Sequence, residues 1–542
     1  MAMNVSSTDF LTPAAAATST SSTNTIKALL VTLFISIVST VIKLQRRAAL
    51  KKTSKILPLP PGPKPWPFVG NIPEMIRYRP TFRWVDQLMK EMNTDICLIR
   101  FGRTNVIPVN CPIIARELLK KNDAIFSNRP MILSAKEMSG GYQTAIVVPN
   151  NDQWKKMRKI LTSEIVSPAK HKWLHDKRAE EADNLVFYIH NQYKANNNVN
   201  LRLVARHYCG NVIRKMMFSK RYFGEATPDG APGRMEIEHV DSVFAVLKYL
   251  YAFCISDFMP FLLGLDLDGQ EKFVLEANKT LRAFHNPIID ERIELWRSGQ
   301  RKEMKDLLDV FITLQDSDGK PLLTPDEIKS QVAEVMIATI DNPSNAVEWA
   351  IGELLNQPEI LKKATEEIDR VVGKDRLVQE SDIPDLNYVK ACAREAFRLH
   401  PVAYFNPPHV AAQDAEICGY LIPEGSWVML SRYGLGRNPK TWPNPLKYDP
   451  ERHLNEGEVV LTEHGLRFIS FSTGRRGCIA ALLGTCMTTM LLARMLQCFT
   501  WNLPDNVEKI DLSEGVDELF PANPVVAFPK PRLAPHLYPT SP

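Results

Sequence analysis

One cysteine stands at the centre of the residues in this sequence that are able to do chemistry. Cys478 lies in the stretch Phe471–Ala480, which also carries glycines and two arginines. Glycine allows backbone to approach a flat ligand closely, because it has no Cβ. The apolar run Ala481–Trp501 predicts a buried helix whose N-terminus begins at the thiol. A helix N-terminus and nearby arginines are expected to lower the pKa of the thiol and to favour the thiolate.

A thiolate in an apolar pocket is the ligand that a haem iron needs to split dioxygen, because it pushes electron density towards the O–O bond. Most free cysteines are instead small, buried and apolar in behaviour, without any chemistry. Cys478 alone therefore leaves two interpretations open, a haem ligand or one more buried cysteine.

Three further motifs bear on that choice. Trp154 and Arg158 are four residues apart on a helical pattern, and both offer N–H donors that suit an anionic carboxylate. Glu395 and Arg398 form a helix-spaced pair of opposite charges. Arg452 is expected on a proline-flanked loop, from which it would complete a buried Glu–Arg–Arg network. Each motif taken alone equally fits an ordinary surface helix or loop.

The elements that position these residues require a large core. The chain has 542 residues, of which 45% are hydrophobic and 23% are charged, enough to build one. Its net charge of +5 is mild and distributed, which gives no indication of nucleic-acid binding. Nine scattered cysteines without CxxC or zinc spacing argue against a disulfide scaffold and for a reducing compartment.

The N-terminal residues are expected to lie outside the folded domain. Residues 1–25 are rich in Ser, Thr and Ala, a composition typical of disorder. Residues 26–44 are predicted to form a transmembrane anchor, whose short apolar core is extended by flanking lysines, and no clear cleavage site follows it. Basic residues on its C-terminal side place the bulk of the chain in the cytosol. Residues 45–63 form a basic, Pro-rich hinge.

Residues 64–542 predict one large domain that is mainly α with minor β. Long helical patterns dominate up to Leu399, and no internal repeat is visible. The remaining expectations are a short hairpin at 95–109, a helix at 112–121, a loop at 134–149 and a second strand region around 410–430.

Together, in this order and spacing, these features resemble the cytochrome P-450 superfamily of haem-thiolate monooxygenases. The order is anchor, Pro-rich hinge, W-x-x-x-R, long central helix, E-x-x-R, P-E-R and F-x-x-G-x-R-x-C. The resemblance implies the triangular helical haem-thiolate fold, with haem b held by Cys478 as axial ligand. It further implies that the haem propionates meet Arg476, Trp154, Arg158, His409 and Arg129, and that Glu395, Arg398 and Arg452 form a structural lock behind the cysteine loop.

The central helix departs from the superfamily pattern. A threonine is usual where this chain has Asn342, and its hydroxyl helps to protonate dioxygen. Pro343 removes a backbone donor and predicts a kink that frees the carbonyl near Thr339. Other exceptions are Ala480 in place of glycine and His453 in place of phenylalanine.

These exceptions resemble the plant subfamily that N-hydroxylates amino acids to aldoximes, whose members share the Asn-Pro helix, the F-N-x-P-H turn and the S-T-G-R-R-G-C-x-A loop. Within it the chain is most similar to the valine/isoleucine N-monooxygenases that begin cyanogenic glucoside synthesis, although Pro407 stands where valine is more usual. Two N-hydroxylations of L-valine or L-isoleucine, then loss of water and carbon dioxide, are the implied reaction. Asp341, Asn342 and Pro343 are the expected catalytic residues, with the Asn342 amide donating to dioxygen and Asp341 feeding protons inward.

The implied partners follow from that chemistry. Each hydroxylation uses one O2 and two electrons from NADPH, and a separate reductase must deliver them because no flavin or GxGxxG fingerprint occurs. Lys155, Lys156 and Lys159 either present positive charge to that reductase or form a solvated helix face. The expected location is the endoplasmic reticulum membrane, and a downstream aldoxime-metabolising cytochrome P-450 is a candidate partner.

Several questions stay open from the sequence. Lys136, or a donor near Ser134 or Asn342, is a candidate partner for the substrate carboxylate. The same chemistry on leucine or an aromatic amino acid fits the same motifs. Three different kinds of protein compete with this interpretation: an ordinary carbon-hydroxylating enzyme, a reductase-independent hydroperoxide isomerase and a non-catalytic haem protein. The Asn342-Pro343 pair argues against the first, and the anchor argues against the second.

Overall fold

The computed structural model describes residues 57–541 except 226, 251 and 517–518. Its chain divides into two compact units, Met1–Pro58 and Leu59–Pro542, and the fold below is that of the second. The N-terminal segments that the sequence predicts, at 1–25 and 26–44, lie outside the described residues.

Helices dominate the described part of the chain, as predicted. The α-helices are α2 (Ile72–Arg77), α3 (Thr81–Glu91), α4 (Pro112–Arg116), α5 (Leu133–Met138), α6 (Asp152–Ile160), α7 (Pro168–Trp173), α8 (His175–Lys194), α9 (Leu201–Phe218), α10 (Arg234–Leu250), α11 (Ile255–Phe258), α12 (Gln270–Arg297), α13 (Leu307–Thr313), α14 (Pro325–Asn356), α15 (Pro358–Val371), α16 (Asn387–Leu399), α17 (Arg432–Gly436) and α18 (Ala481–Cys498).

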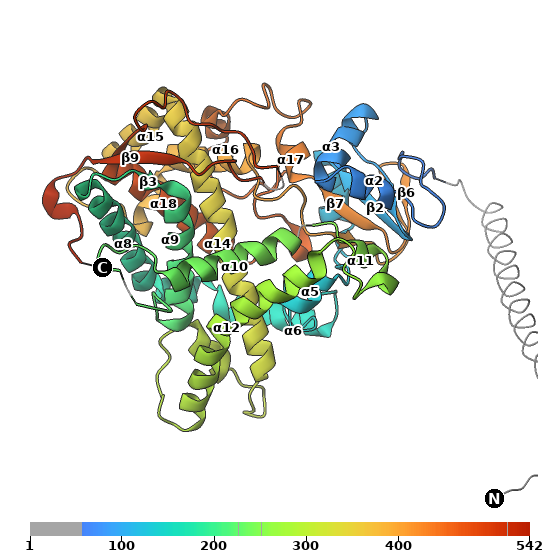
Figure 1. Cartoon of the computed structure of the whole chain (residues 1–542), viewed down its shortest axis with the longest axis horizontal. Helices are drawn as coiled ribbons and strands as arrows, with labels where there is room; N and C mark the ends of the chain where they lie inside the picture. Colours follow the sequence, from blue (N-terminus) through green and yellow to red (C-terminus); the bar gives the residue numbers. More distant parts are fainter. Residues whose placement is uncertain (1–56, 226, 251, 517–518, 542) are drawn as a thin grey trace, which may run out of the picture. The chain divides into compact units, whose positions relative to one another are not determined.

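The strands of the described residues form three small sheets. The largest has the order β1-β2-β7-β4, and it joins the predicted hairpin at 95–109 to the predicted strand region around 410–430. Figure 1 shows this sheet beside α2 and α3, apart from most of the helices. The strands are β1 (Ile99–Phe101), β2 (Thr104–Val109), β3 (Val199–Asn200), β4 (His409–Val410), β5 (Ala415–Ile417), β6 (Tyr420–Ile422), β7 (Trp427–Leu430), β8 (Phe499–Asn502) and β9 (Val526–Pro531).

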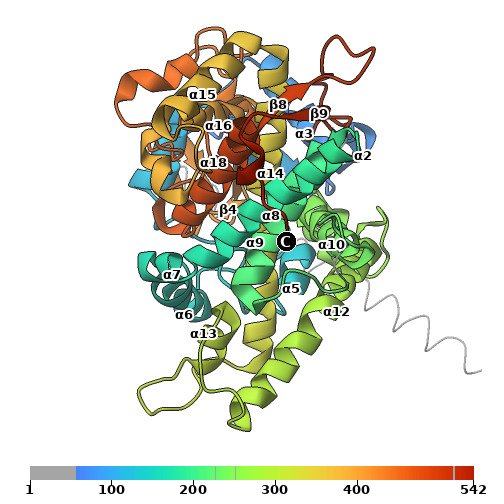
Figure 2. The same ribbon diagram turned by 90° about the vertical axis from the view of Figure 1, so that its left-hand side faces the viewer.

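The long helix α14 forms the centre of the helical part. Its start is fixed by a capping box: Thr324 Oγ1 accepts from Glu327 N at 3.2 Å, and Glu327 Oε2 accepts from Thr324 N at 2.8 Å. Figures 1 and 2 show α14 running through the middle of the molecule, with α9 and α18 beside it. Each of these three helices contributes fully buried apolar side chains to the largest core, for example Val212, Ile340 and Leu491.

Helix α18 directly follows the Cys478 loop, as its apolar sequence predicts. It is long and apolar enough to cross a membrane, and so is the segment Arg234–Phe258. Most of each is buried inside this unit, which is the behaviour of core helices.

Three local predictions need correction. The predicted loop at 134–149 begins inside helix α5. The proline-flanked loop that carries Arg452 is a 3₁₀ turn, Pro450–Glu456, because proline is well tolerated in the first turn of a helix. The predicted helix Ala481–Trp501 ends at Cys498, where the chain enters strand β8.

Candidate active site

The loop around Cys478 is closed by its own backbone. Cys478 N donates to Phe471 O at 2.8 Å, and helix α18 starts three residues later. Gly474 has a φ of +72°, and a Cβ at this position would lie 2.4 Å from Leu119 O. A side chain is therefore excluded at Gly474 both by conformation and by space.

A cavity lies over this loop. Its walls come from α14, α18, the segment around Asn406 and the loop before α6. Seven of the residues that the sequence singles out line it: Arg129, Arg158, Asp341, Asn342, Pro343, Arg476 and Cys478. Segments more than 300 residues apart in the chain thus meet at one place.

The environment of the thiol differs from the prediction in one respect. Burial raises the pKa of the Cys478 thiol, although the Ala480 N–H and the charges of Arg158 and Arg432 act in the opposite, predicted direction. The residue Cys478 has exposed surface and yet is surrounded by protein, because it lines the cavity. The effect of desolvation on the pKa of this thiol is therefore larger than the opposing effects of the helix N-terminus and the arginines.

Buried positive charge gathers on one side of the cavity. The Arg476 guanidinium lies 4.2 Å from the centroid of the Trp154 ring, and that of Arg158 lies 5.9 Å from it. Burial, reinforced by the charges of Arg129 and Arg158, lowers the pKa of Arg476 to about 8, and Glu334 opposes this shift. Such a cluster is unfavourable unless an anion joins it.

The comparisons with known proteins decide the family. The model of the cytochrome P-450 family matches residues 60–526. The chain belongs to the cytochrome P-450 family. Valine N-monooxygenases 1 and 2 of Manihot esculenta are each 78% identical to it over 542 residues, which is the whole of both chains. Isoleucine N-monooxygenase 1 of Lotus japonicus is 56% identical over 498 residues, 91% of this chain and 93% of its own. Tyrosine N-monooxygenase of Sorghum bicolor is 58% identical over 489 residues, 89% and 88% of the two chains.

Membership of the cytochrome P-450 family implies a haem-thiolate centre, and the residues around Cys478 fit such a group. The Trp154 indole N–H is buried and makes no hydrogen bond to any described residue, although a buried donor of this kind is normally satisfied. It lies beside the half-buried guanidinium of Arg476. An anionic propionate would satisfy both groups at once.

The other contacts of the predicted propionate residues are with backbone. Arg476 Nη2 donates to Val148 O at 2.8 Å, and Arg158 Nη2 donates to Gly477 O at 3.0 Å. Arg129 Nη1 donates to Pro408 O at 2.8 Å. These bonds hold the guanidinium groups beside the cavity, and those of Arg158 and Arg476 keep further N–H groups that no described residue accepts.

Of the five predicted propionate residues, Trp154 and His409 do not line the cavity. His409 is the less direct of these two, because its ring offers no donor to an anion. Its Nδ1 lies 2.7 Å from the Phe126 carbonyl oxygen, so Nδ1 carries the proton and donates. The neutral ring then has an acceptor at Nε2, which has no partner among the described residues. It would therefore meet a carboxylate only as an imidazolium, whereas burial and the charge of Arg129 hold the pKa of His409 well below its usual range.

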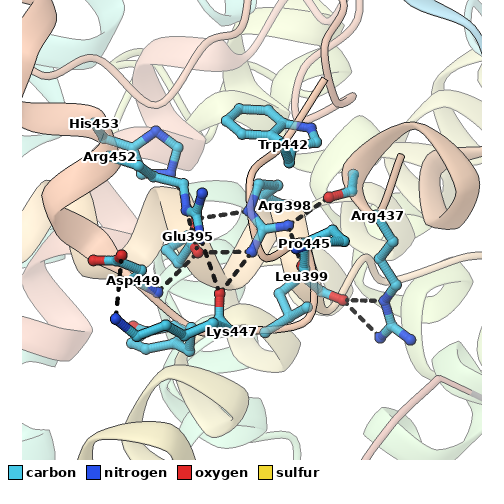
Figure 3. A network of polar contacts seen from close by, with 12 residues as sticks. Glu395, Arg398, Leu399, Arg437, Trp442, Pro445, Lys447, Asp449, Arg452 and His453 are labelled. Atoms are coloured by element: carbon cyan, nitrogen blue, oxygen red, sulfur yellow. Dashed lines mark hydrogen bonds and ion pairs between the residues drawn. The ribbon is translucent and has the colours of Figure 1, made fainter. Parts of the chain in front are cut away.

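Figure 3 shows the network around Glu395. Arg398 donates to both Glu395 oxygens, and Arg452 Nε donates to Oε1 at 3.0 Å. Sequence reasoning missed two further donors, His453 Nε2 at 2.8 Å and Asp449 N at 2.9 Å. The unusual histidine after P-E-R was the signal that pointed to the first of them.

Arg398 extends this network to the meander before the cysteine loop. Its Nη1 donates to Pro445 O at 2.7 Å, and its Nη2 donates to Lys447 O at 3.1 Å. The predicted trio thus lies together and ties α16 to residues 436–453.

The central helix presents an amide to the cavity. The neighbouring hydroxyls are used inside the helix: Thr339 Oγ1 donates to Val335 O and Ser344 Oγ donates to Ile340 O, both at 2.7 Å. Asn342 lines the cavity, and its side chain makes no hydrogen bond within the described chain. The polar side chain available to a ligand here is therefore the amide, with the Asp341 carboxylate next to it on the cavity wall.

Two other predicted site residues lie elsewhere. Lys136 is exposed and lines a separate surface groove between α5 and α12, so it cannot reach a ligand over Cys478. Ser134 is buried with an unpartnered hydroxyl, and it does not line the cavity either. Neither side chain therefore lines the cavity over Cys478, and a donor near Ser134 or Asn342 for the substrate carboxylate stays a prediction.

One cluster of side chains that could bind a metal ion is better explained as an ion pair. His171, Glu380 and Cys486 bring their ligand atoms within 4.8 Å of one another. Arg178 donates to both Glu380 oxygens at 2.7 Å, however, and its positive charge would oppose a metal ion. The cluster is therefore a buried ion pair between α8 and the segment before α16.

Proposed function

We propose that this protein is an amino-acid N-monooxygenase that converts L-valine and L-isoleucine to the corresponding aldoximes. The observation that carries the proposal is the 78% identity, over the full length, to two valine N-monooxygenases. The reaction comprises two successive hydroxylations of the amine, followed by loss of water and carbon dioxide. Its product is a precursor for cyanogenic glucosides of the linamarin and lotaustralin type.

The cofactor in this proposal is haem b, with Cys478 as the axial ligand of the iron. When bound, it supplies the activation of dioxygen that a thiolate ligand promotes. Arg476, Trp154 and Arg158 would hold its propionates, with Arg129 behind them and His409 as a further neighbour. Glu395, Arg398 and Arg452 would keep the backbone before the cysteine loop in place.

Asp341, Asn342 and Pro343 are the proposed catalytic residues. Support comes from their place on the cavity wall and from the engagement of the Thr339 and Ser344 hydroxyls within the helix. The Asn342 amide donates a hydrogen bond towards dioxygen, and Asp341 holds or passes the proton that the substrate amine must lose. Pro343 lies inside α14 at the point where the helix faces the cavity.

Electrons come from NADPH through a separate reductase, which docks on a basic surface. Of the three lysines at the predicted surface, Lys155 pairs with Asp152 at 2.9 Å and Lys156 with Glu327 at 2.7 Å, whereas Lys159 is exposed. The docking charge in this proposal therefore rests more on Lys159 than on the other two.

The proposed location is the endoplasmic reticulum membrane, with one N-terminal anchor at residues 26–44 and the catalytic unit in the cytosol. Some large apolar side chains of the folded unit are exposed. Phe68 and Phe261 are 91% and 76% exposed, and Leu265 and Leu267 are also exposed.

Product analysis tests the proposal. Microsomes that contain this protein and a plant reductase are incubated with NADPH and, separately, valine, isoleucine, leucine, phenylalanine, tyrosine and tryptophan. We expect oximes from valine and isoleucine by mass spectrometry. Oxime from an aromatic amino acid alone would overturn the substrate. The proposed reaction would be wrong if no amino acid gave an oxime while the reduced carbon-monoxide spectrum showed intact thiolate ligation.

A further inference from the structure

The prolyl turn Phe405–His409 is a sequence motif whose asparagine has no role in the proposed reaction. Its backbone pairs with the segment that follows strand β7, where Phe405 and Ser431 face each other in an antiparallel bridge. Side chains alternate between the two faces of paired strands, so the residues next to this bridge share the opposite face. Asn406 and Arg432 therefore lie on one side of the pairing, within reach of each other.

The Asn406 amide connects this turn to two other parts of the cavity wall, and the residue is 3% exposed. Its Oδ1 accepts a hydrogen bond from Arg432 Nε at 3.0 Å, which fixes the orientation of the amide and makes Nδ2 the donor. Nδ2 lies 3.4 Å from Ser472 Oγ, on the loop that carries Cys478. One buried amide thus holds a guanidinium beside the cysteine loop.

Arg432 lines the cavity over Cys478, and most of its side-chain donors are unused. The residue is buried, and among the described residues its side chain donates to Asn406 alone. It forms no ion pair with any carboxylate in the part of the chain that the structure describes. A buried guanidinium without an anion is unfavourable, so this position indicates that an anionic ligand binds in the cavity.

Arg432 is separate from the arginines that gather around Trp154. The guanidinium groups of Arg158 and Arg476 lie 5.9 Å and 4.2 Å from the centroid of that ring. The charge of Arg432 acts on the pKa of Cys478, which it lowers, whereas the pKa of Arg476 responds to other neighbours. The cavity therefore offers an anion a second cationic position besides the cluster at Trp154.

The other cations of the cavity wall differ from Arg432 in their contacts. His171 Nε2 lies 3.7 Å from a Glu380 oxygen, so an acidic partner is already present there. At the prolyl turn, Arg129 Nη1 donates to Pro408 O at 2.8 Å. His409, at the end of the turn, directs its N–H to a backbone carbonyl and offers no donor to an anion. A carboxylate at this turn needs a guanidinium, and Arg432 supplies one.

The link to the cysteine loop indicates which carboxylate this is. A flat group whose iron is bound by Cys478 would cover the loop, so side chains held by the loop would meet the group itself. Asn342, on α14, would instead meet whatever lies over the other face of the group. Because Asn406 ties Arg432 to Ser472, the guanidinium belongs to the side of the loop, and the carboxylate within its reach is a haem propionate.

We propose that Arg432, held in place by Asn406, binds a haem propionate beside the prolyl turn and supplies a positive charge near the iron. The inference rests on the cofactor of the proposed function and adds a residue to its haem site. Asn406 is a positioning residue here, because it acts through the guanidinium. A nearby cation favours the ferrous state, which has one positive charge less than the ferric state, and so raises the reduction potential.

Measurements on the haem of the full-length holoprotein test this inference. We expect Arg432→Gln to lower the equilibrium constant for reduction of the iron on the order of tenfold, which is about 59 mV for one electron. The propionate bending band in the resonance Raman spectrum should shift, and haem transfer to an acceptor apoprotein should become about tenfold faster or more. Arg432→Lys keeps the charge but not the guanidinium, so it should keep the potential while the propionate band still shifts.

Arg437→Gln is the matched control, because Arg437 directly follows the same short helix, α17, but does not line the cavity over Cys478. Its guanidinium already pairs with Glu514 at 2.7 Å. This variant should keep the potential and the propionate band of the wild type even where its stability falls. If Arg432→Gln retains no haem, Arg432→Lys carries the test through the same band.

An unchanged propionate band in both Arg432 variants would overturn the assignment. Weaker binding of L-valine but not of L-valinamide, with that band unchanged, would instead assign Arg432 to the substrate carboxylate. The wild type separates these results from a failure of the proposed function. Absence of the thiolate signature in its reduced carbon-monoxide spectrum would remove both, whereas an intact signature without any oxime would remove only the proposed reaction.

Discussion

Arg398 donates two parallel hydrogen bonds to Glu395, from Nε at 2.8 Å and from Nη2 at 2.7 Å, and both side chains are fully buried. The pair lies one helical turn apart on α16. Its remaining bonds reach the carbonyls of Pro445 and Lys447, in the meander that leads to the cysteine loop. Removal of either charge would leave the other buried without its partner.

We therefore expect Glu395→Gln to destabilise the protein by about 3–5 kcal/mol, the cost of breaking a buried ion pair. Denaturant unfolding followed by circular dichroism, together with haem content, measures the effect. Glu451→Gln is the control, because Glu451 is exposed and pairs with Lys363 at the surface. A surface pair contributes about 0–1 kcal/mol. Equal losses in the two variants would contradict a special role for the lock.

The same carboxyl group gives a pH dependence with a definite sign. Although burial raises the pKa of Glu395, its bonds to Arg398 and His453 outweigh this and lower the pKa from 4.5 to about 2. A carboxyl whose pKa is lower in the folded state adds stability above its unfolded pKa, and this stability is lost as the pH falls through the folded value. The stability difference between wild type and Glu395→Gln should thus be constant above about pH 5 and shrink between about pH 4.5 and pH 2. A difference that grows on acidification would refute the assignment.

The orphaned indole N–H of Trp154 gives a test of haem retention. Phenylalanine keeps an aromatic ring beside Arg476 and removes the N–H, which has no partner among the described residues, together with part of the indole ring system. We expect Trp154→Phe to cost the apo-protein only the packing of the lost ring atoms. It should speed haem loss about tenfold or more, the value of one hydrogen bond to a charged group. The rate of haem transfer to an acceptor apoprotein measures this.

Trp442→Phe provides the comparison for that experiment. The Trp442 N–H donates to Leu435 O at 3.2 Å and to Arg467 O at 3.3 Å, within the protein itself. Trp442→Phe should therefore lower the stability of the apo-protein. Its rate of haem loss should rise only as far as this loss of stability explains. If Trp154→Phe behaves in the same way, Trp154 has a structural role and does not hold a propionate.

The extent to which sequence predicted this site depends on how local each signal was. The Cys478 loop, the Trp154–Arg158 spacing and the Asn342-Pro343 pair are short motifs, and the structure places all of them at or beside one cavity. Residue spacing likewise predicted helices at α6 and α16, and a continuous apolar run predicted α18, which is buried almost all round. These features depend on neighbours within a few residues.

The features that sequence missed depend on contacts between distant segments. The exposed side of α5 carries Lys136, and only the packing of α5 against α12 decides that this lysine faces away from the cavity. The Asn406 amide reaches both Arg432 and Ser472, and Ser472 lies 66 residues further along the chain. Similarly, whether desolvation or the arginines dominate the pKa of Cys478 depends on the whole cavity wall.

The last prediction concerns the residue that replaces the usual threonine of the central helix. Asn342 presents an amide to the cavity, while the hydroxyl of Ser344 is occupied by the Ile340 carbonyl. Asn342→Thr restores a hydroxyl and removes the amide NH2, which has two N–H donors. The substitution should therefore be harmful if the amide positions dioxygen while the substrate amine relays the proton. We expect at least about a tenfold fall in oxime formed, within the range for a misplaced proton-transfer group, and less oxime per NADPH consumed.

Ser344→Ala, which alters a hydroxyl that is already engaged in the helix, should keep that ratio. Unchanged turnover and coupling in Asn342→Thr would show that the amide has no part in proton delivery.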